Sequence, residues 1–474
     1  MAFAAPLPRL RAVPVRDLGA AMRALADLPH PFLLHSMLED ERARWSFFGA
    51  DPFAVFRGGD HAAAIAAFRA HAARAAGDAP PGIIPFAGGA VGYWAYDYGR
   101  RLERLPARAR DDLGLPDFWF ACYDVVVAYD HATREAWAIS SGLPVEGAAR
   151  AAHAERRLDE IAWRLEALAP AVARWDDAPG AGGVARSTFG ADAYRRAVEA
   201  VREHIRRGDI FQANLSQRWT LPLAAARPCD RALSLFEAIA RHTPAPYAAF
   251  LCAGDHAVAS ASPERFLAVR GRRVETRPIK GTRPRGADAA EDRRLAAELL
   301  ASAKDRAENV MIVDVLRNDL GRVCETGSVR TPELCALESF PQVHHLVSTV
   351  EGTLREGLDP FDLLHACFPG GSITGAPKIR AMEILDALEP VRRHVYTGAV
   401  GYVDWRGHAD WNIAIRTALV TRDAVHVAAG GGVTADSDPD AEYEETLHKA
   451  EGLRAALSAA VGPVTLDAAP AGVR

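Results

Sequence analysis

The chain has few cysteines for its length, and no two of them lie close together. Its 474 residues contain six, and these are Cys122, Cys229, Cys252, Cys324, Cys335 and Cys367. Without a C-x-x-C pair, the sequence contains neither a zinc knuckle nor a thioredoxin-type redox motif. Scattered single cysteines in a long chain instead predict buried thiols in a reducing compartment.

The sequence also lacks a long apolar segment and an excess of positive charge. Prolines and arginines occupy the first residues, where a signal peptide would need an apolar core, and no apolar run approaches the length of a membrane span. The formal net charge of −5 argues against the broad basic surface of a nucleic-acid-binding protein. We therefore expect a cytoplasmic protein that contacts neither a membrane nor a nucleic acid.

What the chain does have is an ordinary globular composition, with 49% hydrophobic and 25% charged residues. Its length predicts two or three domains, or one large intertwined unit. Prolines and glycines cluster in residues 169–188, which we interpret as a linker. This linker would separate an N-terminal region (1–168) from a C-terminal region (189–460) that is followed by a short tail (461–474).

Hydrophobic periodicity predicts a mixture of helices and strands. Helices are expected at residues 62–76, 148–168 and 194–205, the last ended by Gly208. Strands are expected at residues 32–36, 123–129 and 210–219, and a strand, turn and strand at 83–96. In the strand 210–219, Gln212 lies on a polar face that lines either a wet cavity or the solvent.

A basic segment, residues 277–286, places Lys280 among three arginines, with prolines and glycines on both sides. It could be a solvated surface loop. It could also lower the pKa of Lys280, because nearby positive charges disfavour the ammonium form and leave a nucleophilic amine. The segment alone does not decide between the two.

Acidic residues at two places raise the question of a metal site. Asp438 before Pro439 predicts the start of a helix, on which Glu442 and Glu445 would share one face. Glu308 would reach back to Asp305 in a capping box. These carboxylates could simply favour helix N-termini, or they could bind a hard cation such as Mg²⁺.

Three further motifs carry candidate functional groups. Glu264, after a strand at 257–261, is either a general acid or the partner of Arg265 in a salt bridge. Arg416, in an expected strand at 411–417, is either paired internally or directed at a carboxylate. Three glycines at 430–432 follow an expected strand at 424–429 and could offer backbone N–H groups to a carboxylate. Read alone, the glycines would suit a nucleotide, but no βαβ unit follows them.

Taken together and in this order, the motifs resemble those of the chorismate-utilising enzymes. The resemblance rests on SPERF (262–266), RPIKGTRPRG (277–286), DRAENVMIVDVLRNDLGRV (305–323), GGSITGAPKIRAMEI (370–384), the segment 411–417 and GGGVTADSDPDAEYEETLHKA (430–450). It implies an α+β fold of two large antiparallel β-sheets, packed face to face and wrapped by helices. The N-terminal region would contribute strands, and the C-terminal region would bind chorismate.

The resemblance also implies roles for individual residues. Glu308 and Glu445 would hold Mg²⁺, with Glu442 close by, and the metal would bind the ring carboxylate of chorismate. Ser36 and the pair Pro246–Tyr247 match positions that hold tryptophan in relatives, where it is either regulatory or structural. The implied substrate contacts are Gln212, Gly281, Thr282, His345, Tyr402, Arg416, Gly430, Gly431, Gly432 and Lys449.

Two positions bear on the reaction. Family members that add water carry a lysine base where this chain has Gln212, which cannot take a proton from water. Members that form anthranilate carry alanine where this chain has Lys280. The resemblance therefore implies the branch that forms aminodeoxychorismate for p-aminobenzoate and folate synthesis, with anthranilate formation as the alternative.

In the aminodeoxychorismate-forming branch, the lysine is the nucleophile. Lys280 would attack ring carbon 2 while Glu264 protonates the departing 4-hydroxyl, and ammonia would then add at carbon 4 and expel the lysine. We find no glutaminase triad in this sequence. Ammonia is therefore expected from a separate glutaminase subunit or from free ammonium.

Overall fold

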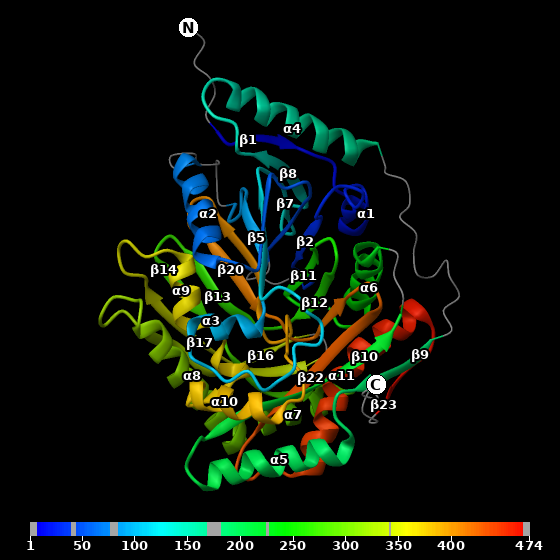
Figure 1. Ribbon diagram of the computed structural model, residues 1–474, viewed down its shortest axis with the longest axis vertical. Helices are drawn as coiled ribbons and strands as arrows, with labels where there is room; N and C mark the ends of the chain where they lie inside the picture. The colour runs from blue at the N-terminus through cyan, green and yellow to red at the C-terminus, as the bar shows by residue number, and fades with distance from the viewer. Residues whose placement is uncertain are drawn as a thin grey trace.

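The computed structural model describes residues 7–38, 44–75, 84–167, 182–223, 227–340 and 343–467. Two large β-sheets form its centre (Figure 1). Apart from one parallel pair, the strand pairs within them are antiparallel, so the expected α+β fold is confirmed.

The first sheet has thirteen strands. From edge to edge they are β1 (Arg9–Ala12), β8 (Glu135–Ser140), β7 (Val125–Asp130), β3 (Trp45–Gly49), β2 (Phe32–His35), β11 (Tyr247–Cys252), β12 (Ala257–Ser262), β21 (Thr417–Val420), β22 (Ala424–Val433), β10 (Gln212–Pro222), β9 (Gly183–Ser187) and β23 (Val464–Asp467), with β18 (Gly375–Ala376) also paired to β10.

The second sheet has ten strands. They are β15 (Ile279–Pro284), β17 (Val343–Thr353), β14 (Arg273–Thr276), β13 (Arg265–Arg270), β20 (Ala409–Ile413), β19 (Ala399–Asp404), β5 (Gly89–Trp94), β6 (Phe118–Tyr123) and β4 (Ala54–Arg57), with β16 (Arg330–Ser339) paired to β17.

Strands from both halves of the chain build both sheets. In the first sheet, β2 pairs with β11, and in the second, β5 pairs with β19. The expected contribution of strands by the N-terminal region is thus confirmed. An apolar layer between the sheets includes Phe47 and Val126 from one side and Tyr93 and Trp119 from the other.

Helices cover the outer faces of the two sheets (Figure 1). On the first sheet lie α1 (Leu18–Arg23), α4 (Ala149–Glu166), α6 (Pro228–His242) and α11 (Pro439–Val461). On the second lie α2 (His61–Ala75), α8 (Ala303–Gly321) and α9 (Pro360–Cys367). The other helical elements are α3 (Gly99–Leu102), α5 (Ala191–Arg206), α7 (Ala289–Ala301), α10 (Lys378–Leu388) and the short turns η2 (Tyr96–Tyr98) and η4 (Gly371–Ile373).

The structure confirms the helices expected from periodicity, which are α2, α4 and α5, and the strands β2, β7 and β10. The predicted helix start at Asp438 is also confirmed, because its side chain accepts hydrogen bonds from the N–H groups of Asp440 and Ala441.

Several local predictions were wrong. The segment 83–96 contains one described strand, β5, and the strand expected at 411–417 stops at Ile413. The capping box at Asp305 is absent, because Ser302 caps α8 and Glu308 lies inside the helix. Part of the expected linker forms β9, which pairs in parallel with β23 from the expected tail. Residues 168–181 and 468–474 lie outside the described residues.

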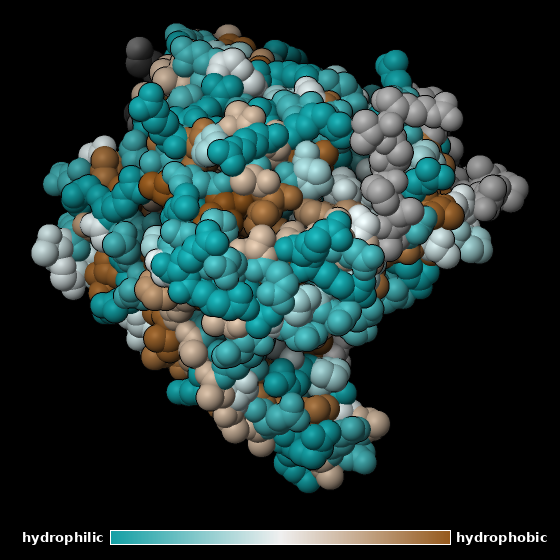
Figure 2. All heavy atoms as spheres, turned by 60° about the horizontal axis from the view of Figure 1, so that its bottom comes forward, coloured by the Kyte–Doolittle hydropathy of each residue, from teal (hydrophilic) through white to brown (hydrophobic). Residues whose placement is uncertain are grey.

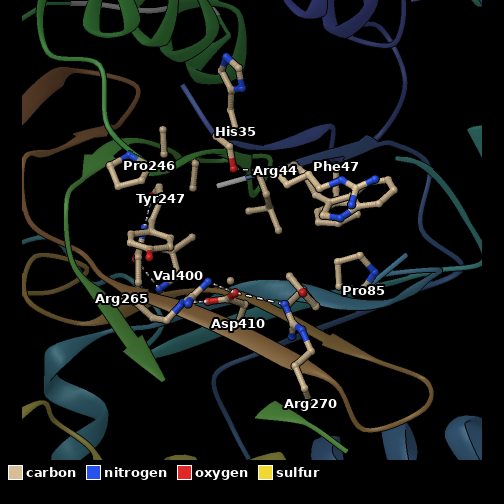
Figure 3. Close-up of a pocket in the computed structure, with 18 residues that line it drawn as sticks. His35, Arg44, Phe47, Pro85, Pro246, Tyr247, Arg265, Arg270, Val400 and Asp410 are labelled. Carbon is tan, nitrogen blue, oxygen red and sulfur yellow. Dashed lines mark hydrogen bonds and ion pairs between the residues drawn. The ribbon is translucent and has the colours of Figure 1, made fainter. Parts of the chain in front are cut away.

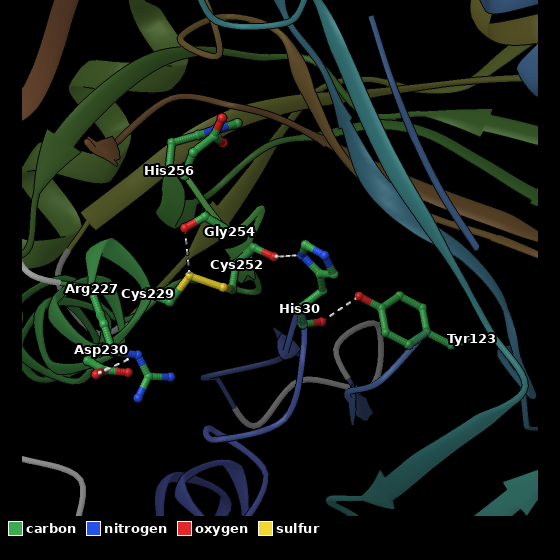
Figure 4. Close-up of a disulfide and its surroundings, with 9 residues drawn as sticks. His30, Tyr123, Arg227, Cys229, Asp230, Cys252, Gly254 and His256 are labelled. Atoms are coloured by element: carbon green, nitrogen blue, oxygen red, sulfur yellow. Dashed lines mark hydrogen bonds and ion pairs between the residues drawn. A yellow bond between two sulfur atoms is a disulfide. The ribbon is translucent and has the colours of Figure 1, made fainter. Parts of the chain in front are cut away.

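The prediction of free thiols fails for two cysteines. Cys229 in α6 and Cys252 at the end of β11 form a disulfide, with Cα atoms 5.2 Å apart (Figure 4). Folding brings the start of the helix against the end of the strand, and their spacing in the sequence gave no sign of this. Cys122, Cys324, Cys335 and Cys367 are buried free thiols, as expected.

The surface is mainly hydrophilic on the face shown in Figure 2, with apolar side chains gathered in a band across its middle. Among the described residues, no helix is both long and apolar enough to cross a membrane.

Candidate active site

A cavity of about 570 Å³ opens where β15 and α8 face β22 and α11. It contains most of the predicted site residues, although they come from distant parts of the chain. Those that line it are Glu264, Lys280, Gly281, Thr282, Glu308, His345, Arg416, Gly430, Gly432, Glu442, Glu445 and Lys449.

Lys280 lies on β15 and extends into this cavity. Its Nζ donates a hydrogen bond to the Ser372 carbonyl oxygen at 3.2 Å. Burial lowers the pKa of Lys280, and the positive charge of Lys449 adds to this effect, while the Glu308 carboxylate opposes it. The amine is therefore more easily deprotonated than an ordinary lysine.

The neighbouring arginines do not lower the pKa of Lys280, contrary to the sequence-based hypothesis. Arg277 pairs with Glu333 at 3.3 Å, Arg283 with Glu298 at 2.8 Å, and Arg285 with Asp292 at 2.7 Å. Each of these arginines is thus paired with a carboxylate, and the causes that act on Lys280 are burial and the charges of Glu308, Lys449, Glu264 and Glu445.

Glu264 follows β12 and is 5% exposed. Burial raises the pKa of its carboxyl group to about 7, although the Ser372 hydroxyl, the Lys280 charge and the Ile279 N–H all favour the ionised form. The alternative of a salt bridge to Arg265 is excluded, because that guanidinium pairs with Asp410 and Glu275. Glu264 can therefore hold a proton near neutral pH.

Three carboxylates line the cavity, one from the side of Lys280 and two from the side of α11. Glu308 projects from α8, while Glu442 and Glu445 project from the first turns of α11. Burial raises the pKa of Glu308 and of Glu442. For Glu445, burial is outweighed by the Lys449 ammonium at 2.6 Å, and its pKa is lowered.

These carboxylates suit a magnesium ion. The Glu442 Oε2 atom is buried without a hydrogen-bond partner, whereas its Oε1 accepts from the Ser437 hydroxyl. Within the described residues, no three acidic, histidine or cysteine side chains form a complete metal-binding cluster. A Mg²⁺ ion usually takes one or two carboxylates and completes its shell with water and substrate oxygens, so the unpartnered Glu442 Oε2 is the observation here that suits such an ion.

The glycines 430–432 lie inside β22 rather than after it, so they do not form the loop that we expected. Gly432 pairs with Asn214 of β10. A Cβ atom at Gly432 would lie 2.0 Å from Gln212 Nε2 and 3.7 Å from Lys280 Nζ, and one at Gly431 would lie 2.7 Å from Glu442 Oε2. Glycine here lets side chains from β10, β15 and α11 approach the strand.

Arg416 and His345 contribute polar groups to the cavity wall. Arg416 lies between β20 and β21 with a φ of 49°, and no carboxylate of the described residues forms an ion pair with it. His345 Nδ1 shares a hydrogen bond with the Thr282 hydroxyl at 2.9 Å. Burial, assisted by the Arg416 charge, lowers the pKa of His345 to about 4, so the imidazole is neutral.

Comparison with known proteins identifies the family of this chain. Residues 34–455 match the family described as chorismate binding enzyme. The chain belongs to that family. As a member of it, the protein is an enzyme that acts on chorismate.

Relatives with two different names are similarly close. The chain is 42% identical to anthranilate synthase component 1 of Thermus thermophilus over 456 residues, which cover 93% of this chain and 95% of the relative. It is 44% identical to aminodeoxychorismate synthase component 1 of Klebsiella aerogenes over 366 residues, covering 77% and 76%. The crystal structure of anthranilate synthase component I from Streptococcus pneumoniae is 31% identical, with a TM-score of 0.71 and coverage of 88% and 93%.

A second cavity, of about 250 Å³, lies between the two sheets (Figure 3). It brings together Ser36, Pro246 and Tyr247, the three positions predicted to hold tryptophan. Tyr402 also lines this second cavity and is absent from the lining of the first, which differs from its predicted place beside Lys280. The tyrosine that lines the Lys280 cavity of this chorismate-binding enzyme is Tyr396 and not Tyr402.

Sequence reasoning also missed Ser372, Lys304 and Tyr396, which line the Lys280 cavity. Ser372 belongs to the segment GGSITGAPKIRAMEI, which contributes to the resemblance but gave this serine no role. Lys304 and Tyr396 stand in no motif, so no sequence signal could have indicated them.

Proposed function

We propose that this enzyme converts chorismate and ammonia to 4-amino-4-deoxychorismate, as the chorismate-binding subunit of an aminodeoxychorismate synthase. The observation that carries the proposal is the pair formed by a lysine of lowered pKa and a carboxyl group of raised pKa in one cavity. A neutral amine can attack carbon, and a protonated carboxyl can release a hydroxyl as water.

In the proposed reaction, the Lys280 amine forms a bond to ring carbon 2. Both ring double bonds shift along the ring, and the bond from carbon 4 to its hydroxyl breaks as Glu264 donates a proton, which releases water. Ammonia then bonds to carbon 4, both double bonds shift back, and the bond to Lys280 breaks. The proton lost by the incoming ammonia returns to Glu264, so the enzyme is regenerated.

Arg416, neutral His345 and Lys449 support the binding of a dicarboxylate, because they provide positive charge and hydrogen-bond donors around the cavity. We propose that Glu308 and Glu445 hold Mg²⁺, with Glu442 beside them. The ion would supply positive charge for the ring carboxylate of chorismate.

Ammonia would come from a separate glutaminase subunit. The support is the word "component" in the names of the relatives, which indicates that each is one part of a larger enzyme. Free ammonium should replace the partner in an assay with the isolated subunit.

Anthranilate formation is the second candidate, and the Thermus thermophilus relative favours it because the match spans nearly its whole length. One assay separates the two: purified protein with chorismate, Mg²⁺ and ammonium. We expect a product that gives p-aminobenzoate only after a lyase is added, and we expect Lys280→Ala to abolish it. Anthranilate formed directly by the wild-type enzyme would overturn the proposal.

For the second cavity we propose tryptophan as the ligand, supported by the aromatic side chains of Trp45, Phe47 and Tyr247 in its lining. Arg265 lies over the Tyr247 ring at 4.9 Å (Figure 3). Calorimetric titration with tryptophan tests this proposal, and Ser36→Trp should abolish binding by filling the cavity. No heat of binding to ligand-free wild-type protein would contradict it.

A further inference from the structure

One short turn contacts both of the groups to which we assign the chemistry. Ser372 lies in η4, which closes the cavity opposite β15. Its carbonyl oxygen accepts the hydrogen bond from Lys280 Nζ, and its hydroxyl acts on the Glu264 carboxyl group, whose ionised form it favours. A single residue thus links a side chain on β15 to one that follows β12.

The strand that carries Lys280 acts on Glu264 as well. The backbone N–H of Ile279, directly before Lys280, also favours the ionised form of the Glu264 carboxyl group. Two donors from different segments thus act on this carboxyl group. Fixed geometry matters for a general acid, since it must lie within hydrogen-bond reach of the atom that it protonates.

The turn is itself fixed by its neighbours. The Thr374 hydroxyl donates to the carbonyl oxygens of Gly370 and Gly371, at 3.0 and 3.3 Å. A Cβ atom at Gly371 would lie 2.8 Å from Val315 Cγ1 of α8, so the turn is pressed against that helix.

Behind the turn lies a buried ion pair. Arg393 Nη1 donates to the Ile373 carbonyl oxygen at 2.9 Å, and Arg393 Nη2 donates to that of Asn214. Glu389 accepts from Arg393 at 2.6 and 2.8 Å and also from the Ser216 N–H and hydroxyl, both at 2.9 Å. Both charged side chains are less than 10% exposed. The pair therefore connects η4 rigidly to β10.

We propose that Ser372 is a positioning residue that holds the nucleophile Lys280 and the acid Glu264 at one fixed separation, and that the Arg393–Glu389 pair holds Ser372 in place. This inference rests on the proposed function, because it takes its two reacting groups from there. It adds that alignment of the two groups depends on a residue that takes no part in the bonds formed and broken during the reaction.

A double-mutant cycle tests the inference. Ser372→Ala should lower kcat about tenfold to a hundredfold, within the lower range that a positioned general acid contributes, and should change KM for chorismate less than threefold. In a Glu264→Gln background the same substitution should lower kcat less than about twofold, because substitutions of residues that act as a unit do not have additive effects. Ser372→Thr keeps the hydroxyl and should restore most of kcat.

A matched control comes from the same turn. Thr374→Val removes a hydroxyl that bonds within the turn and not to Glu264. The factor by which it lowers kcat should therefore multiply with the factor for Glu264→Gln in the double variant. If Ser372→Ala instead multiplies with Glu264→Gln, or if Ser372→Thr is as impaired as Ser372→Ala, Ser372 has only a structural role and the proposal is wrong.

A second measurement does not depend on turnover, and it separates failure of this inference from failure of the proposed function. At a pH well below 7, the protonated Glu264 carboxyl has an infrared C=O band, identified by its absence in Glu264→Gln. Loss of the Ser372 hydroxyl should move this band to higher wavenumber in Ser372→Ala and leave it in place in Thr374→Val. An unchanged band in Ser372→Ala would overturn the inference, even if the enzyme makes another product.

Discussion

Glu264 is a carboxyl group enclosed by protein, and its environment decides when it carries a proton. Burial raises its pKa to about 7, from 4.5 for an ordinary glutamate. Between these two values, the native protein binds a proton that the unfolded chain has released. The free energy of unfolding therefore falls as pH rises through this range.

Replacing Glu264 by glutamine should remove this dependence. The difference between the two pKa values corresponds to about 3 kcal/mol as an upper bound. We expect Glu264→Gln to gain up to that amount of stability relative to wild type between about pH 4.5 and pH 8. Denaturant unfolding of both proteins across this range measures it. A stability difference that stays constant with pH would show that Glu264 titrates normally.

At the scale of secondary-structure elements, close approach of α11 to β22 is what forms the acidic side of the cavity. Helix α11 begins at Pro439, so Glu442 and Glu445 lie in its first turns. Gly431 on β22 provides the space into which Glu442 Oε2 fits. Helix and strand thus depend on each other for the carboxylate geometry.

Gly431→Ala should therefore weaken magnesium binding. The added methyl group would lie 2.7 Å from Glu442 Oε2 and 3.3 Å from Glu445 Oε1, so both carboxylates must move. We expect the Kd for Mg²⁺, measured by calorimetry, to rise about tenfold or more, the loss typical of disturbed groups around a metal. Gly321→Ala, where the new methyl group meets no atom within 4 Å, is the control and should keep the wild-type Kd. Equal Kd values for both variants would refute this role of Gly431.

The disulfide between α6 and β11 should stabilise the protein. It closes a loop with a sequence separation of 23 residues, and such cross-links typically contribute about 2–4 kcal/mol. We expect reduction by dithiothreitol to lower the free energy of unfolding by about this amount. The Cys229→Ser/Cys252→Ser variant should be as unstable without reductant as reduced wild type, and dithiothreitol should not change it further. If dithiothreitol destabilises both proteins equally, the bond is not the cause.

Sequence reasoning predicted single elements well and their mutual positions poorly. The start of α11 could be predicted, because Asp438 before Pro439 is a local signal. Gln212 is buried beside Gly432 and is not among the residues that line the Lys280 cavity, and its alternation in the strand did not decide between a cavity and the solvent. The end of the strand before Arg416 could not be predicted, because a positive φ in a residue other than glycine has no signature in the sequence. Nor could the separation of Tyr402 from Lys280, which depends on the packing of two sheets.

At the scale of the whole molecule, neither half of the chain forms a complete sheet by itself. The N-terminal region supplies strands next to β11 in one sheet and next to β19 in the other. Each half alone would expose strand edges and one side of the apolar layer between the sheets.

Separate fragments should therefore fail to fold. We expect residues 1–168 and residues 182–474, expressed singly, to show no cooperative thermal unfolding by circular dichroism. Co-expressed, they should assemble into a stable one-to-one complex that co-purifies. A cooperative transition in either isolated fragment would show that the region folds as an independent domain.

The parallel pair of β9 and β23 has a consequence for the order of the gene. Val464 lies directly opposite Gly183, so the C-terminal region begins and ends at the same edge of the first sheet. Because the two strands are parallel, a connection that leaves from Asp467 starts beside Arg186, at the other end of β9 from the point where the natural connection arrives. A gene in which the codons for residues 1–168 follow those for residues 183–467 would encode a circular permutant, and its new linker would have to reach from this edge to β1 at the opposite edge of the sheet.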